Sequence, residues 1–130
     1  MNEGIIMLGS NHHPEENIVK AKDKINDHYE IIDESAVLIT LPRGEKYKHH
    51  FLNQAIKILS DEKAEDSIRF FKQIEAELGR TPEGKAQGII PIDIDFVFWN
   101  ETAMRNDYDK WDFVRICIDQ IKDKPSTSKV

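Results

Sequence analysis

The sequence has a single cysteine, no long apolar run and no strongly basic stretch, and each of these shortages excludes a class of protein. Cys117 has no partner within the chain for a disulfide bond. No apolar stretch approaches the ~20 residues that a membrane-spanning helix needs, and none resembles a cleavable signal. We therefore expect a soluble, reduced, cytoplasmic protein without a membrane partner.

Positive charge is also in short supply, since 24 acidic residues outnumber 18 basic ones and give a net charge of −6. A protein that binds a nucleic-acid backbone generally needs a concentrated basic face, whereas the lysines here are interspersed with acids. We therefore expect no nucleic-acid partner, and the sequence indicates no protein partner. A small ligand with phosphate groups stays open, because magnesium and a few local cations can neutralise it.

The length of 130 residues, 39% of them hydrophobic, suits one compact core. We expect residues 1–121 to form a single domain and residues 122–130 to be a disordered tail. The apolar pattern predicts a strand at Gly4–Gly9 and a helix from Pro14 to about His28. Residues 30–41 and 51–59 are predicted to be neighbouring antiparallel strands, although the second stretch also fits helical spacing.

The second half of the chain predicts a helix over residues 63–78, which ends at Gly79. Residues 79–91 hold three glycines and two prolines and predict a long loop. A strand over residues 92–99 follows, and residues 111–121 fit either a last helix or a strand. This order predicts an α+β fold of the ferredoxin-like βαββαβ type, with an antiparallel sheet, two helices on one face and the opposite face open.

Asp93 and Asp95 are two residues apart on the last predicted strand, so both point to one face of the sheet. Two carboxylates whose backbones lie roughly 6–7 Å apart repel each other unless a cation sits between them. Magnesium accepts one or two carboxylates together with phosphate and water oxygens. The pair therefore indicates a metal–nucleotide site, although two solvated acids that protect an edge strand explain this motif equally well.

Phe51 and Asn53 share a strand face in the same way. The ring can stack on a flat heterocycle and the amide can pair with its edge, but a core phenylalanine beside a turn asparagine is the commoner arrangement. The two histidine pairs, at residues 12–13 and 49–50, have no acid or cysteine at a standard ligand spacing and are expected to be surface residues. We expect Cys117, Trp99 and Trp111 to pack in the core.

Four short motifs, taken in order, resemble those of the 6-hydroxymethyl-7,8-dihydropterin pyrophosphokinase family. They are Leu8-Gly9-Ser10-Asn11, Phe51-Leu52-Asn53, Ile74-Glu75 followed by Gly79-Arg80, and Asp93-Ile94-Asp95. The resemblance implies a ferredoxin-like transferase of folate biosynthesis that uses ATP and a pterin. The pterin hydroxyl would attack the β-phosphorus of ATP and release AMP, while the protein supplies positioning and charge stabilisation.

The resemblance also implies a role for each matching residue. Asp93 and Asp95 would be catalytic and would hold two Mg²⁺ ions at the ATP phosphates. Arg80 would also be catalytic. It would stand at the start of a mobile loop that closes over the phosphates. The other residues form a pterin set and a nucleotide set, namely Thr40, Phe51, Asn53 and Phe113 for the pterin, and Glu75, Lys72 and Lys85 for the nucleotide.

The chain departs from the family pattern in two places. Ile90 stands where the family has the arginine of a Gly-Pro-Arg motif, and residues 104–114 lack the family's Pro-His segment. Lys85, Lys72 and Arg43 are the cations left to compensate. Losing an oriented phosphate ligand can cost on the order of 10²-fold in turnover. The alternatives are therefore an impaired paralogue that binds a pterin or nucleotide without turnover, or a ferredoxin-like interaction module.

Overall fold

The computed structural model of the chain describes residues 1–42, 44–45 and 47–122. Of the predicted tail at residues 122–130, residues 123–130 lie outside these described residues, and so does the candidate cation Arg43. The elements in chain order are β1 Asn2–Ser10, α1 Pro14–His28, β2 Glu30–Glu34, β3 Leu38–Thr40, β4 Phe51–Ser60, α2 Ala64–Glu77, α3 Pro82–Ala86, β5 Asp93–Trp99, β6 Thr102–Ala103, α4 Asp107–Lys110 and α5 Asp112–Asp119.

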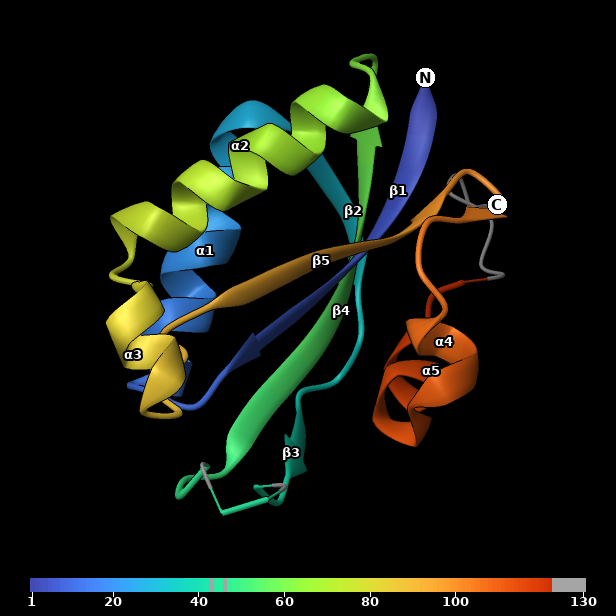
Figure 1. Cartoon of the computed structure of the whole chain (residues 1–130). Helices are drawn as coiled ribbons and strands as arrows, with labels where there is room; N and C mark the ends of the chain where they lie inside the picture. Colours follow the sequence, from blue (N-terminus) through green and yellow to red (C-terminus); the bar gives the residue numbers. More distant parts are fainter. Residues whose placement is uncertain (43, 46, 123–130) are drawn as a thin grey trace.

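The strands form one antiparallel sheet in the order β2-β4-β1-β5-β6, with β3 also paired to β4. β1 lies in the middle of the sheet because its alternate residues are apolar on both faces (Figure 1). Ile6 and Leu8 point to one face, while Ile5 and Met7 point to the other, and all four are buried. The predicted strand over residues 51–59 is confirmed as β4, which excludes the helical alternative.

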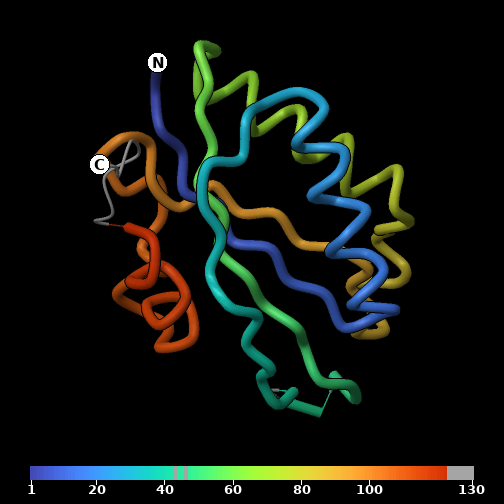
Figure 2. The backbone as a smooth tube through the Cα atoms, turned by 180° about the vertical axis from the view of Figure 1, so that it is seen from behind, coloured from blue at the N-terminus to red at the C-terminus, as the bar shows by residue number. Residues whose placement is uncertain are grey.

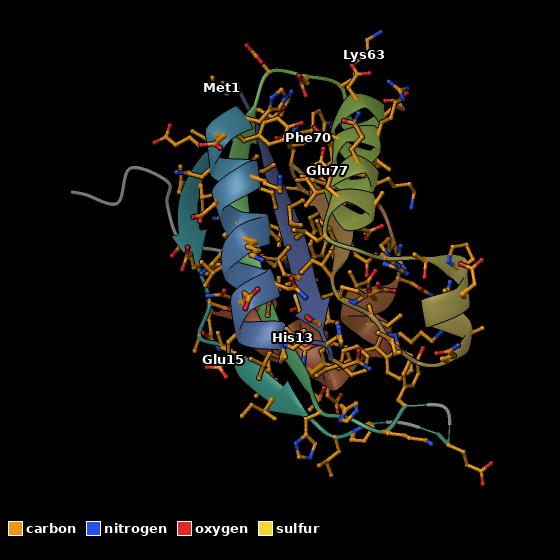
Figure 3. All side chains as sticks on the ribbon, turned by 90° about the vertical axis from the view of Figure 1, so that its left-hand side faces the viewer. Met1, His13, Glu15, Lys63, Phe70 and Glu77 are labelled. Atoms are coloured by element: carbon orange, nitrogen blue, oxygen red, sulfur yellow. The ribbon has the colours of Figure 1, made fainter. Side chains whose placement is uncertain are left out.

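α1 and α2 run side by side across one face of the sheet, as Figures 2 and 3 show. The core beneath them joins Ile6 and Leu8 of β1 to Ile18 of α1, and to Phe71 and Ile74 of α2. Both helices place apolar residues three and four apart, which gives each a single buried stripe. The predicted α+β, ferredoxin-like βαββαβ fold is confirmed.

The opposite face of the sheet is not open, which corrects the expectation from the sequence. Residues 112–119 form α5, and Val114, Cys117 and Ile118 of this helix are buried against Ile5 and Met7 of β1. Figure 1 shows α4 and α5 on the side of the sheet away from α1 and α2. A helix with a strongly apolar stripe needs a surface to cover, and the exposed face of the sheet supplies it.

Two local expectations are also wrong. Residues 30–41 form two strands, because Glu34 lies opposite Ile56 whereas Leu38 lies opposite Asn53, so one extra residue interrupts the ladder. The expected loop at residues 79–91 contains the short helix α3, whose N-cap Thr81 accepts a hydrogen bond from Gly84 N at 2.9 Å. Threonine followed by proline is a helix-start signal that the loop interpretation missed. Within the described ranges, no helix is long and apolar enough to cross a membrane.

Candidate active site

A pocket of 410 Å³ lies on the α5 side of the sheet, where the ends of β1, β4 and β5 meet the C-terminal helices. Its lining brings together polar, aromatic and charged side chains from five separate segments. The described residues that line it are Met7, Leu8, Gly9, Thr40, Leu41, Tyr47, Phe51, Asn53, Asp93, Asp95, Arg105, Asp107, Lys110, Trp111, Phe113 and Val114.

The strand register forms the floor of this pocket. Gly9 of β1 lies opposite Asn53 on one neighbouring strand and opposite Asp93 on the other. Met7, two residues earlier on the same face, lies opposite Asp95. Because Gly9 has no side chain, the row from Asn53 to Asp93 has a gap at its centre. The atoms nearest to a Cβ at Gly9 would be Asn53 Oδ1 at 3.4 Å and Leu52 O at 4.0 Å, which are ordinary contact distances, and Gly9 itself lines the pocket.

Each of the two carboxylates faces one arginine. Arg80 Nη1 lies 2.8 Å from Asp93 Oδ1, and Arg105 Nη1 lies 3.4 Å from Asp95 Oδ1. The pKa of Asp95 is raised to about 8, mainly by burial and then by the charge and hydrogen bond of Asp93, while Arg105 opposes the rise. The pair is therefore short of positive charge, although both arginines are in place.

The donor set fits a magnesium ion that completes its coordination with ligand oxygens. Among the described residues, no group of three histidine, cysteine or acidic side chains is placed to hold a metal. Asp93 and Asp95 supply two carboxylates to an open pocket, which suits a cation that keeps water and takes phosphate oxygens. A cation between them would also relieve the repulsion that raises the pKa of Asp95.

Arg80 is held by Glu75 as well as by Asp93. Glu75 is buried at the end of α2, and its Oε2 accepts hydrogen bonds from Ile94 N at 2.8 Å and from Arg80 Nη1 at 3.1 Å. Burial raises the pKa of Glu75, although the Ile94 bond and Arg80 lower it. This carboxylate ties α2 to the backbone of β5 and orients Arg80 toward Asp93.

The residues predicted to bind the pterin lie together on the other side of the pocket. Asn53 Nδ2 donates to Leu38 O and to Thr40 Oγ1, both at 3.0 Å, which fixes the side-chain amide. The Phe51 and Tyr47 rings have centroids 5.5 Å apart, and the Phe113 and Trp111 rings have centroids 6.3 Å apart. The pocket lining thus contains two half-buried aromatic pairs and an oriented amide.

The structure separates the predicted nucleotide set from this pocket. Glu75, Lys72 and Lys85 do not belong to its described lining, and neither does Arg80, a predicted catalytic residue. Lys72 is exposed on α2 and Lys85 is exposed on α3. Arg80 reaches the pocket through its ion pair with Asp93.

Sequence reasoning missed the contribution of residues 105–111. Arg105, Asp107 and Lys110 line the pocket, and so does Trp111, which is half buried rather than a full core residue. The sequence does contain a signal for this contribution. Arg105 and Lys110 alternate with acidic residues directly after a strand that carries two aspartates.

A second hollow, of 520 Å³, lies at the start of α1 and is separate from the pocket. His13 and Glu15 mark this end of the helix in Figure 3. The fold brings the two histidine pairs together here, at residues 12–13 and 49–50, and all four side chains are exposed.

Comparison with known proteins identifies the family of this chain. The sequence model of a family described as 7,8-dihydro-6-hydroxymethylpterin-pyrophosphokinase (HPPK) matches residues 5–123. The chain is also similar to the folic acid synthesis protein FOL1 of Dictyostelium discoideum, with 29% identity over 92 residues. That match covers 71% of this chain and 14% of FOL1, so the chain spans only a small part of this relative. Since the family match runs from β1 through α5, this chain belongs to the HPPK family.

Proposed function

We propose that this chain transfers pyrophosphate from ATP to 6-hydroxymethyl-7,8-dihydropterin and releases AMP. The HPPK family consists of ATP-dependent pyrophosphokinases that act on a pterin in folate synthesis. One observation carries the proposal for this chain, namely that a single pocket holds the Asp93–Asp95 pair beside the set of Phe51, Asn53 and Phe113. Such a pocket has a place for phosphates at one end and for a flat heterocycle at the other.

The pterin end of the proposed site depends on an oriented amide between aromatic rings. Both protons of Asn53 Nδ2 have acceptors in the protein, at Leu38 O and Thr40 Oγ1. Asn53 Oδ1 is then the atom that accepts from an N–H group of the pterin. Thr40 supplies backbone groups at the rim, and Phe51 and Phe113 stack on the ring faces.

The phosphate end depends on charge. Asp93 and Asp95 would hold magnesium, proposed as two ions that enter with ATP, and this metal would neutralise the phosphates during transfer. Arg80 is proposed to exchange Asp93 for a phosphate oxygen, since its guanidinium already lies 2.8 Å from that carboxylate. Glu75, Lys72 and Lys85 are proposed to act on the nucleotide from outside the pocket lining.

The test is AMP release from ATP, Mg²⁺ and 6-hydroxymethyl-7,8-dihydropterin by the purified protein. We expect pterin-dependent AMP from the wild type and at least about 10²-fold less from Asp95→Ala, because one of the two carboxylates at the phosphates is removed. Asp61→Ala, which removes an exposed carboxylate at the opposite end of β4, should leave the rate unchanged. Pterin-dependent AMP that survives in Asp95→Ala would contradict the role of this carboxylate.

A catalytically impaired paralogue is the second candidate, and the placement of Ile90 favours it. The side chain of Ile90 is 5% exposed, its backbone N donates to Asn11 Oδ1 at 2.7 Å, and its carbonyl accepts from Asn11 N at 3.0 Å. This position belongs to the interior of the fold, so it offers no cation to phosphates. Thermal stabilisation by the pterin or by nucleotide without AMP release would support this candidate, and turnover would exclude it.

A further inference from the structure

The segment between β6 and α4 carries an arginine into the pocket. Arg105 Nε donates to Asp107 Oδ2 at 2.7 Å, and Arg105 Nη1 lies 3.4 Å from Asp95 Oδ1. The Asp107 side chain is only 15% exposed, so it is a fixed support, whereas that of Arg105 is 47% exposed. Arg105 and Lys110 are the cationic residues in the described lining. The tip of the Arg105 guanidinium is therefore anchored at one edge and open to the pocket at the other.

This arrangement places Arg105 where a divalent cation would otherwise sit. Asp93 already has Arg80 at 2.8 Å, and Asp95 has Arg105. A guanidinium and a metal ion at the same carboxylate repel each other, so Arg105 and a divalent cation compete for Asp95. Guanidinium groups also bind phosphate oxygens in a two-pronged geometry that an ammonium group cannot match.

We infer that Arg105 is a phosphate-binding residue with two positions. In the empty pocket its guanidinium lies against Asp95, and with nucleotide bound it turns to the phosphates while Asp107 keeps hold of Nε. This inference rests on the proposed function. It identifies Arg105, in the segment between β6 and α4, as a source of the positive charge that Ile90 does not provide. Arg105 then couples the two ligands, because the metal gains Asp95 only when the phosphates take over the guanidinium.

The inference makes two predictions of opposite sign for Arg105→Gln, which keeps most of the side-chain length and removes the charge. Mn²⁺ without nucleotide should bind about 3-fold to 10-fold more tightly, because its competitor at Asp95 is gone. A magnesium complex of α,β-methylene-ATP, whose α–β bridge cannot be cleaved, should bind about 10-fold to 100-fold more weakly, because a charge-assisted phosphate contact is lost.

The experiment is calorimetric titration of both probes into four proteins, namely wild type, Arg105→Gln, Arg105→Lys and Arg69→Ala. Arg105→Lys keeps the charge and should weaken nucleotide binding while leaving Mn²⁺ affinity near that of the wild type. Arg69→Ala is the matched control, because it removes an exposed arginine that pairs with Asp66 on α2. Thermal unfolding of each protein establishes that the substitutions leave the fold intact.

Opposite shifts for the two probes in Arg105→Gln would support the inference, since a merely structural loss weakens both. Shifts in the same direction, or affinities equal to those of the wild type and Arg69→Ala, would overturn it and leave the proposed function standing. A wild type that binds Mn²⁺ but not the nucleotide analogue would overturn the proposed function and this inference together. The wild-type titration therefore separates the two failures.

Discussion

At the scale of single residues, the candidate site depends on Gly9 as much as on its charged neighbours. Gly9 lies between Asn53 and Asp93 in the sheet, and any side chain there would occupy the floor of the pocket. The backbone around it is regular strand, and the nearest atoms to an added Cβ are Asn53 Oδ1 at 3.4 Å and Leu52 O at 4.0 Å. Substitution should therefore affect ligands more than folding.

We expect Gly9→Val to weaken binding of 6-hydroxymethyl-7,8-dihydropterin, measured with the nucleotide analogue present, by about 10-fold or more. The two methyl groups of valine would project into the space between Asn53 and Asp93. The fold should tolerate the substitution, because β-branched residues are favoured in strands. Calorimetry gives the affinity and thermal unfolding gives the stability. Gly9→Ala serves as the graded control with a smaller loss, and an unchanged affinity in Gly9→Val would place the pterin elsewhere.

The sequence predicted the parts of this site that follow from strand alternation. Asp93 and Asp95 share a face because they are two residues apart, and Phe51 and Asn53 share a face for the same reason. Register across strands then brought the two sets into one pocket. Arg105 could not be predicted in this way, because its position depends on how a short irregular segment folds back over β5.

At the scale of secondary-structure elements, α5 has a double role. Its buried residues cover the sheet face that the sequence predicted to be open, and its first turn places Phe113 and Val114 in the pocket lining. The βαββαβ order was predictable from local periodicity. The docking of α5 was not, because an amphipathic stretch reveals that it has a buried face but not which surface covers that face.

Two isoleucines on α5 allow this docking to be measured. Ile118 is fully buried and Ile116 is 50% exposed, although they lie two residues apart on the same helix. We expect Ile118→Ala to lower the free energy of unfolding by about 2–4 kcal/mol, because it leaves a cavity against the sheet. Ile116→Ala should change it by about 0.5 kcal/mol or less. Urea unfolding gives both values, and equal losses would mean that α5 is not docked on the sheet.

At the scale of the whole molecule, the net charge of −6 is distributed unevenly between surface and pocket. Most acidic residues are exposed, and some of them pair with lysines or arginines, as in the Glu16–Lys20 and Asp66–Arg69 pairs. Such exposed pairs change stability little. Asp95 differs because its side chain is only 24% exposed and lies beside a second carboxylate. It is therefore expected to influence how the stability of the whole protein depends on pH.

The folded protein should bind an extra proton at this site over a defined pH range. The pKa of Asp95 is raised from 3.8 to about 8, so between these values the folded chain holds a proton that the unfolded chain has released. The contribution of Asp95 to the free energy of unfolding is fully present below about pH 4 and is lost as the pH rises through about 8. A magnesium ion or another cation bound at Asp93 and Asp95 would reduce this loss of stability, because it favours the charged form of the carboxylate.

We expect Asp95→Asn to remove this pH dependence, because the amide does not titrate. Relative to the wild type, the variant should gain on the order of 1–3 kcal/mol in free energy of unfolding between about pH 4 and about pH 9. Urea unfolding across this range measures the difference between the two proteins. Asp61→Asn, which removes an exposed charge far from the pocket, should follow the wild-type curve. Parallel curves for the wild type and Asp95→Asn would mean that Asp95 is ionised at neutral pH, with Arg105 balancing the charge of Asp93 and Asp95 together.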